Sequence, residues 1–231
     1  MGERSRTAPR CGSCRMLEPL CVCALVTPLA SRTHVICVLH KMEEVKPTNT
    51  GHLLAMILEN AECRVRGERG QALDTHDFED PARRTLLLFP SEDARVLSPE
   101  LLAEDARPVR LIVPDATWKQ ASRLARKVDA LKHAERVVLP PGQVSEYRLR
   151  RHARPDALCT YEAVVEALCI IDDPALREPL EQLFRVFVDR TLWSRGELKA
   201  SEVTGGITTE VAQWKNCSPL GARGAARSAR N

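Results

Sequence analysis

The sequence predicts an α/β fold in which a mostly parallel sheet carries helices on both faces. From residue 34 onward, short and almost entirely apolar runs alternate with stretches of helical periodicity, which is typical of this class. The apolar fraction is 44% but aromatic residues are only 4% of the chain, so aliphatic side chains are abundant enough to build a large core. A globular protein is therefore expected, and global disorder is not.

Four runs are predicted to be buried parallel strands, because they are short and as apolar as strands covered on both faces should be. They are residues 34–39, 85–89, 111–113 and 136–139. A proline follows each of the last three runs and restricts the loop behind it. In a parallel sheet the ligand site lies at the carboxyl ends of the strands, so these loops are the predicted site.

Helices are expected in five segments, of which the last three place apolar residues on one face. They are residues 50–61, 99–104, 118–131, 160–171 and 176–192. The last seventeen residues, 215–231, place arginines among Gly, Ala and Ser, and we expect them to form a disordered basic tail.

Four of the nine cysteines fall within thirteen residues, as Cys11, Cys14, Cys21 and Cys23. Four thiolates on one short segment are the ligands that a tetrahedral zinc ion prefers. We expect a zinc knuckle within an N-terminal segment of residues 1–33, with a structural ion because all four ligand positions are filled by protein. Reduced cysteines in a flexible leader and an iron–sulfur cluster are alternatives that the spacing leaves open.

The chain is expected to be cytoplasmic and to have no membrane partner. No apolar run approaches the roughly 20 residues of a membrane span. No apolar stretch follows the first basic residues, so a secretory signal is not expected. The odd number of cysteines agrees with a compartment in which thiols stay reduced.

The segment after the third predicted strand carries Asp115, Thr117 and Trp118 where a strand ends and a helix begins. Thr117 and Gln120 form a capping-box pattern, and Asp115 could bind amides at the same helix start. Trp118 could lie in the core or form a stacking surface. These structural interpretations stay open beside a catalytic one.

Asp115-Ala116-Thr117-Trp118 resembles the D-x-T-W signature of the DTW-domain family, tRNA-uridine aminocarboxypropyltransferases related to SPOUT-type RNA methyltransferases. Further segments resemble that family in the same order, over roughly residues 11–195. They are the four-cysteine cluster and residues 46–51, 88–93, 147–151 and 160–163. Cys159 and Lys41 depart from the family pattern.

The resemblance implies transfer of the 3-amino-3-carboxypropyl group from S-adenosylmethionine to N3 of a uridine in tRNA, with release of methylthioadenosine. It also implies a SPOUT-like knotted C-terminal half within a catalytic domain of residues 34–214. An RNA methyltransferase with the same donor and a non-catalytic zinc-containing RNA-binding protein remain alternatives. No obligate protein partner is indicated, and the oligomeric state is not predicted.

The resemblance assigns catalysis to Asp115, Thr117 and Trp118. Asp115 is predicted to accept the proton of uridine N3, and Thr117 to fix the Asp115 carboxylate or to contact the donor. Trp118 is predicted to stack on the uracil or to line the donor pocket. The residues predicted to bind S-adenosylmethionine are Phe89, Pro90, Ser91, Pro114, Leu139, Pro140, Tyr147, Leu149 and Thr160.

The net charge of +3 is an average over segregated charge. Residues 107–154 carry 12 basic and 4 acidic side chains, whereas residues 34–106 carry 8 basic and 14 acidic ones. The basic segment includes the predicted active site, where an RNA substrate needs a positive field. The residues predicted to contact RNA are Lys46, Asn49, Arg148, Arg150, Arg151 and Arg154. Some of these arginines could instead bind the donor's carboxylate.

Overall fold

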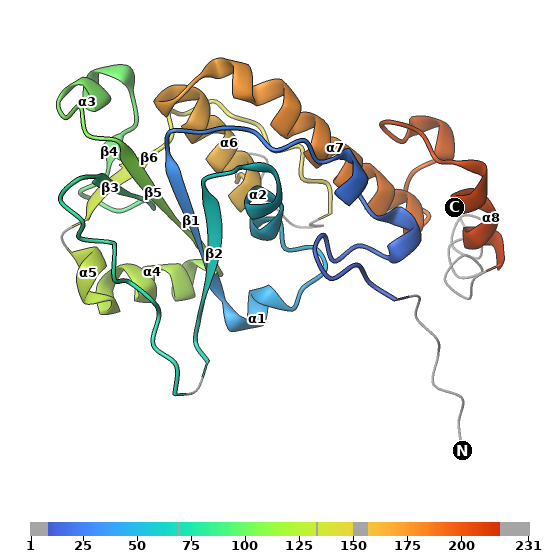
Figure 1. Ribbon diagram of the computed structural model, residues 1–231, viewed down its shortest axis with the longest axis horizontal. Coiled ribbons are helices and arrows are strands. Elements are labelled where there is room, and N and C mark those ends of the chain that lie inside the picture. The colour runs from blue at the N-terminus through green and yellow to red at the C-terminus, as the bar shows by residue number, and fades with distance from the viewer. Residues whose placement is uncertain (1–8, 69, 133, 150–156, 218–231) are drawn as a thin grey trace. The chain divides into compact units, whose positions relative to one another are not determined.

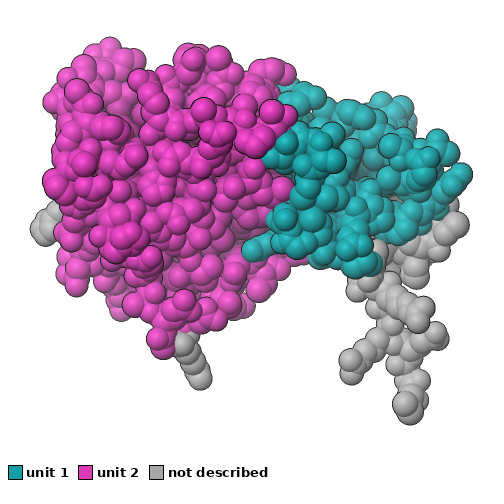
Figure 2. Space-filling model, in the orientation of Figure 1, with its two compact units in different colours: residues 1–26, 146–153, 181–231 teal, residues 27–145, 154–180 magenta. Residues whose placement is uncertain are grey.

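The computed structural model describes residues 9–68, 70–132, 134–149 and 157–217 of the 231-residue chain. The chain divides into two compact units, shown in Figure 2. Unit 1 comprises residues 1–26, 146–153 and 181–231, and unit 2 comprises residues 27–145 and 154–180. Unit 1 is assembled from three separate parts of the chain, and the predicted boundaries after residues 33 and 214 stay predictions.

Unit 2 is built on a six-stranded sheet with the order β2-β1-β5-β3-β6-β4 (Figure 1). The strands are β1 (His34–His40), β2 (Ala61–Arg66), β3 (Arg84–Leu88), β4 (Arg95–Val96), β5 (Val109–Asp115) and β6 (Glu135–Val138). Every pairing is parallel, so the carboxyl ends of the strands meet at one edge. The predicted α/β class with a parallel sheet is confirmed.

The interior strands are the ones that the sequence predicts well. β1 and β5 are buried along almost their whole length, because helices cover both faces of the sheet and favour apolar side chains there. β2 and β4 were not predicted; only Ala61, the first residue of β2, fell within a predicted helix. β2 lies at one edge of the sheet and alternates charged residues with apolar ones, so it has no continuous apolar run.

Helices and turns of unit 2 surround this sheet. They are α1 (Lys41–Glu44), α2 (Gly51–Ile57), α3 (Pro99–Ala103), α4 (Trp118–Lys127), α5 (Asp129–Lys132), α6 (Thr160–Ile171) and the 3₁₀ turn η3 (Pro174–Leu176). On one face, Leu124 of α4 and Leu131 of α5 join a buried cluster with Ile36 and Ile112. α2 and α6 contact each other on the opposite face (Figure 1). The predicted helix 118–131 is divided in two because Val128 adopts an extended ψ of 112°.

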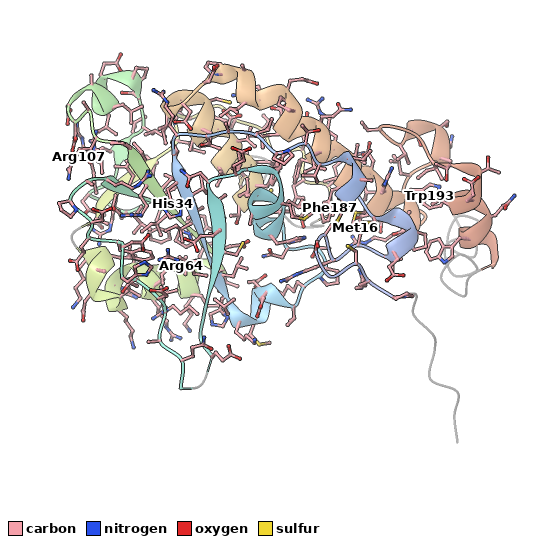
Figure 3. All side chains as sticks on the ribbon, viewed as in Figure 1. Met16, His34, Arg64, Arg107, Phe187 and Trp193 are labelled. Atoms are coloured by element: carbon pink, nitrogen blue, oxygen red, sulfur yellow. The ribbon has the colours of Figure 1, made fainter. Side chains whose placement is uncertain are left out.

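Unit 1 combines the N-terminal segment with C-terminal helices. Its elements are the 3₁₀ turns η1 (Glu18–Leu20), η2 (Cys23–Leu25) and η4 (Ala200–Glu202), α8 (Thr209–Cys217) and residues 181–194 of α7 (Arg177–Ser194). Met16 and Phe187, labelled in Figure 3, belong to its buried apolar residues. α8 extends to Cys217, so the first residues of the predicted disordered tail are helical, and residues 218–231 lie outside the described part.

Two further predictions concern the chain as a whole. The segment between β6 and α6 includes residues 150–156, which lie outside the described residues, so the knot stays a prediction. In the described ranges, no helix combines the length and the apolar character that crossing a membrane requires.

Candidate functional site

Asp115 is the last residue of β5, at the carboxyl ends of the strands, where a parallel sheet binds its ligands. It lies in register with Leu39 of β1, and its side chain faces α2. The residue is only 4% exposed. Nδ2 of Asn49 donates a hydrogen bond of 2.7 Å to its Oδ2, so the buried carboxylate is oriented by a side chain from a distant segment.

Helix α2 begins directly against this carboxylate. A methyl group at Gly51, the first residue of α2, would lie 2.5 Å from Oδ2 of Asp115 and 3.2 Å from Leu39. Only glycine permits this close approach. The free N–H groups at a helix start also favour a negative charge. Both the packing and the electrostatics therefore favour the Asp115 carboxylate at the start of α2.

Asn49, predicted from the sequence to contact RNA, is buried in the structure, and its RNA role stays a prediction. It is 5% exposed, and its Oδ1 lies 3.4 Å from Nδ1 of His52 while its Nδ2 binds Asp115. Its position before a glycine-led helix start is the one sequence signal for such a buried role. Lys46 does lie at the surface, where its Nζ is 2.6 Å from Oε1 of Glu43.

Thr117 is the N-cap of α4. Its backbone N–H donates to Oε1 of Gln120 at 3.0 Å, and its hydroxyl donates to the same oxygen at 2.8 Å. The predicted pairing of Thr117 with Gln120 at this helix start is therefore confirmed. Asn49 donates to the Asp115 carboxylate, and the predicted role of Thr117 toward that carboxylate or the donor stays a prediction.

Trp118 forms an exposed aromatic surface and is not a core residue. It is 68% exposed, and its ring centroid lies 6.0 Å from that of Phe89 with an angle of 48° between the planes. Phe89 in turn packs against the apolar cluster beneath α4. Asp115 and Trp118 therefore lie on opposite sides of the sheet edge, Asp115 with α2 and Trp118 with α4.

The loops predicted to bind the donor leave neighbouring strands, because β5, β3 and β6 are adjacent in the sheet. The N–H of Phe89 donates to the carbonyl of Val137 at 3.1 Å. Four of the residues, Phe89, Pro114, Leu139 and Pro140, are half-buried apolar side chains, whereas Pro90 and Ser91 are exposed. Their role in binding the donor stays a prediction. Thr160, half-buried, begins α6.

The remaining predicted contacts lie in unit 1 or outside the described residues. Tyr147 is buried, and its ring centroid is 5.9 Å from that of Phe184. Leu149 is also buried, and Arg148 pairs with Asp189. Three further residues, Arg150, Arg151 and Arg154, lie outside the described residues. The donor and RNA roles assigned to this segment stay predictions.

The four N-terminal cysteines of unit 1 come together. Their Sγ atoms all lie within 4.8 Å of one another, with 3.5 Å between Cys11 and Cys23 and 3.6 Å between Cys14 and Cys21. Tetrahedral zinc with Zn–S bonds of about 2.3 Å separates its sulfurs by about 3.8 Å. The arrangement therefore fits one metal ion.

The surroundings of the cluster favour the thiolate form of Cys11. Hydrogen bonds from the backbone of Cys14 and Ser13 lower the pKa of Cys11 to about 6, whereas burial and the neighbouring thiols raise the pKa of Cys23 to about 12. Arg190 of α7 donates to the carbonyl oxygen of Cys21 at 2.8 Å. This bond fixes the loop and brings a positive charge near the sulfurs.

A second group of metal-ligand residues, His34, Glu62 and Asp77, is occupied by ion pairs. Arg64 lies 2.6 Å from Glu62 and 2.7 Å from Asp77, and Arg110 lies 3.4 Å from Asp77. Figure 3 labels His34, a member of this group, and Arg64, which pairs with it. Because arginines already neutralise both carboxylates, we assign the group a structural role.

The DTW domain family matches residues 8–192 of the chain. The chain is 29% identical over 191 residues to tRNA-uridine aminocarboxypropyltransferase 2 of Macaca fascicularis, covering 78% of this chain and 64% of that protein. For the protein of the same name in Drosophila melanogaster the identity is 28% over 180 residues, covering 74% and 70%. A solved structure of the SAM-dependent rRNA:acp-transferase Tsr3 from Vulcanisaeta distributa is similar at a TM-score of 0.42 and 17% identity, covering 83% of this chain and 94% of that chain.

Proposed function

The chain belongs to the DTW domain family, and on that basis we propose that it transfers the 3-amino-3-carboxypropyl group of S-adenosylmethionine to N3 of a uridine in tRNA. Methylthioadenosine is the by-product. The observation that carries the proposal is the family match across residues 8–192, together with relatives named tRNA-uridine aminocarboxypropyltransferase 2. The chain spans 64% of the length of the macaque relative.

The reaction sets two tasks for the site. Uridine N3 is mostly protonated at neutral pH, so a base must take its proton while the N3–carbon bond forms and the carbon–sulfur bond breaks. The sulfonium leaves as a neutral thioether and needs no further activation. The protein must therefore present the aminocarboxypropyl carbon, and not the methyl carbon, to N3.

Asp115 is the proposed base, and Asn49 is the proposed positioning residue that orients its carboxylate. The burial of Asp115 does not argue against this role, because catalytic hydrogen bonds often form only when the substrate is bound. Trp118 is proposed to stack on the uracil, since an exposed and partly supported ring is suited to a base removed from its own stack. The half-buried side chains of Phe89 and Leu139 are proposed to contact the adenosine.

The cysteine cluster is proposed to bind one zinc ion. Four thiols from one segment fill every position of a tetrahedral ion, so the ion has no place for a reacting water and is structural. The cytoplasmic location stays a prediction based on cysteine usage.

Two measurements test the proposed function. Mass spectrometry of tRNA nucleosides from cells with and without the protein should show an aminocarboxypropyl-uridine that disappears when the protein is absent. Purified protein with S-adenosylmethionine and unmodified tRNA should release methylthioadenosine. Release of S-adenosylhomocysteine would indicate an RNA methyltransferase instead, and tRNA binding with neither product would indicate an RNA-binding protein.

A further inference from the structure

Helix α4 carries four cations and no acidic residue. They are Lys119, Arg123, Arg126 and Lys127, and all are exposed. Within the part of the chain that the structure describes, none of them has a carboxylate within 4.0 Å. Most exposed arginines of unit 2, such as Arg95 and Arg107, are held by carboxylates, so this helix face is distinct in charge.

A cavity of about 610 Å³ opens beside the same helix. Arg123 and Lys127 line it from α4, and Arg66 lines it from the end of β2. Three cations from two separate elements therefore converge on one hollow. Within the described residues, Arg66 also has no carboxylate within 4.0 Å.

The two acidic residues that line the cavity are already paired. Glu68 lies 3.3 Å from Nζ of Lys41, and Asp129 lies 2.6 Å from Nζ of Lys132. They therefore cancel little of the charge of the three converging cations. A concave surface with uncompensated arginine and lysine side chains suits phosphate groups.

Trp118 is the first residue of this helix and is 68% exposed. A ten-residue helix is about 15 Å long, so the cations continue over that distance from the aromatic ring. The phosphates of a nucleic-acid strand repeat every few ångströms. One strand can thus place a base on the ring and several phosphates along the helix, which is how single-stranded RNA is commonly bound.

Stabilisation of the helix does not account for this pattern. Cations in the last turn, such as Arg126 and Lys127, do favour the helix dipole. Lys119 in the first turn does not, and neither does Arg66, which approaches from another element. A helix face that is simply solvated usually carries both signs of charge.

We propose that the α4 surface, defined as Lys119, Arg123, Arg126 and Lys127 with Arg66 facing them, binds the phosphate backbone of tRNA beside the target uridine. The inference rests on the proposed function for its choice of tRNA. None of these five residues belongs to the contacts predicted from the sequence.

The test compares the double variant Arg123→Gln/Lys127→Gln with the matched control Arg32→Gln/Arg107→Gln. The control also removes two exposed positive charges from unit 2, but Arg32 and Arg107 precede β1 and β5 and so lie at the opposite edge of the sheet; Figure 3 labels Arg107. The probe is total tRNA, without S-adenosylmethionine, at several salt concentrations. The α4 variant should bind about tenfold more weakly, and the slope of log K against log salt should fall by about one to two. The control should change neither.

An unchanged affinity and slope in the α4 variant would overturn the inference, as would an equal loss in the control. If the variant does not fold, Lys119→Gln/Arg126→Gln gives the same test, because these side chains are exposed and do not line the cavity. Loss of binding to poly-glutamate with unchanged tRNA binding would indicate an acidic protein partner and overturn it too. If the variant loses tRNA affinity but the wild type makes no aminocarboxypropyl-uridine, only the proposed function fails.

Discussion

Nδ2 of Asn49 donates a hydrogen bond of 2.7 Å to Oδ2 of Asp115 across 66 residues of sequence. Both residues are buried, so the bond forms in a medium where an unpaired partner is costly. It ties the segment before α2 to the end of β5. The carboxylate at the proposed site is therefore part of the packing between two segments, and substitutions at either end should affect both stability and catalysis.

Asn49→Ala removes the side-chain donor to a buried carboxylate. We expect the free energy of unfolding to fall by about 1–3 kcal/mol, and transfer to slow because the carboxylate loses its orientation. Urea denaturation and initial rates measure the two effects. Asn60→Ala, which removes only a weak exposed hydrogen bond of 3.5 Å, is the matched control and should change stability by less than about 0.5 kcal/mol. Equal stability of the two variants would contradict the expectation.

Asp115→Asn separates the proposed base from the positioning contact, because the amide oxygen can still accept the hydrogen bond from Asn49. Fold and tRNA binding should be kept, while the rate of transfer falls by about 100-fold or more, as expected for a lost general base. Single-turnover formation of methylthioadenosine measures this rate. Transfer at a near wild-type rate would overturn the assignment of Asp115 as the base and leave it only the structural contact with Asn49. Asp115→Ala is the poorer test, because it also leaves the buried Asn49 amide without this partner.

Gly51→Ala should be destabilising because its methyl group would lie 2.5 Å from Oδ2 of Asp115. The carboxylate is held by Asn49 and cannot move away freely, so we expect a loss of about 1–3 kcal/mol, typical of overpacking. Gly12→Ala is the control, since nothing lies within 4 Å of a methyl group there. Thermal denaturation of both variants measures the loss of stability. A Gly51→Ala protein as stable as the wild type would show that residue 51 has more room beside Asp115 than the structure indicates.

Trp118→Ala should leave the fold intact because the side chain is 68% exposed. Affinity for tRNA should fall by about 1–3 kcal/mol, the usual contribution of one base stacked on an aromatic side chain. Trp118→Phe should recover part of that affinity, because it keeps a ring against Phe89. Filter binding and circular dichroism measure the two properties. A loss of folding without a specific loss of tRNA affinity would return Trp118 to a structural role.

Cys21→Ser should lose the bound metal, because one of four thiolate ligands is removed from a closed tetrahedral site. The wild-type protein is expected to hold about one equivalent of zinc, measured by elemental analysis after purification without added metal. Cys169→Ser, at a half-buried cysteine outside the cluster, should keep its full metal content. Folded wild-type protein without metal would rule out the zinc site, and iron in its place would indicate a cluster.

The sequence predicts best what depends on neighbouring residues. The interior strands β1 and β5 each contain a continuous apolar run, residues 35–39 and 111–114. The cysteine spacing of residues 11–23 brings four thiols together locally. The capping pair Thr117 and Gln120 is similarly local. Each of these features depends on residues that are close together in the sequence.

The sequence does not predict what depends on the order of the strands. Asn49 reaches Asp115 because β1 lies between β2 and β5. No pattern of neighbouring residues in the sequence predicts that β1 and β5 are adjacent. The same holds for Arg66, which faces α4 only after β2 has joined the edge of the sheet. Asp115 and Trp118 lie on opposite faces of the sheet for a similar reason. The turn that joins them passes from one face to the other at the carboxyl end of β5.

The strand order has a consequence for how the chain is made. β2, one partner of β1, follows it closely in the sequence, whereas its other partner, β5, ends only at residue 115. Contacts between residues far apart in sequence form slowly, so a growing chain exposes an unpaired apolar strand edge that other chains can join. We therefore expect aggregation during rapid synthesis, and a higher yield of folded protein when translation is slowed by a lower temperature.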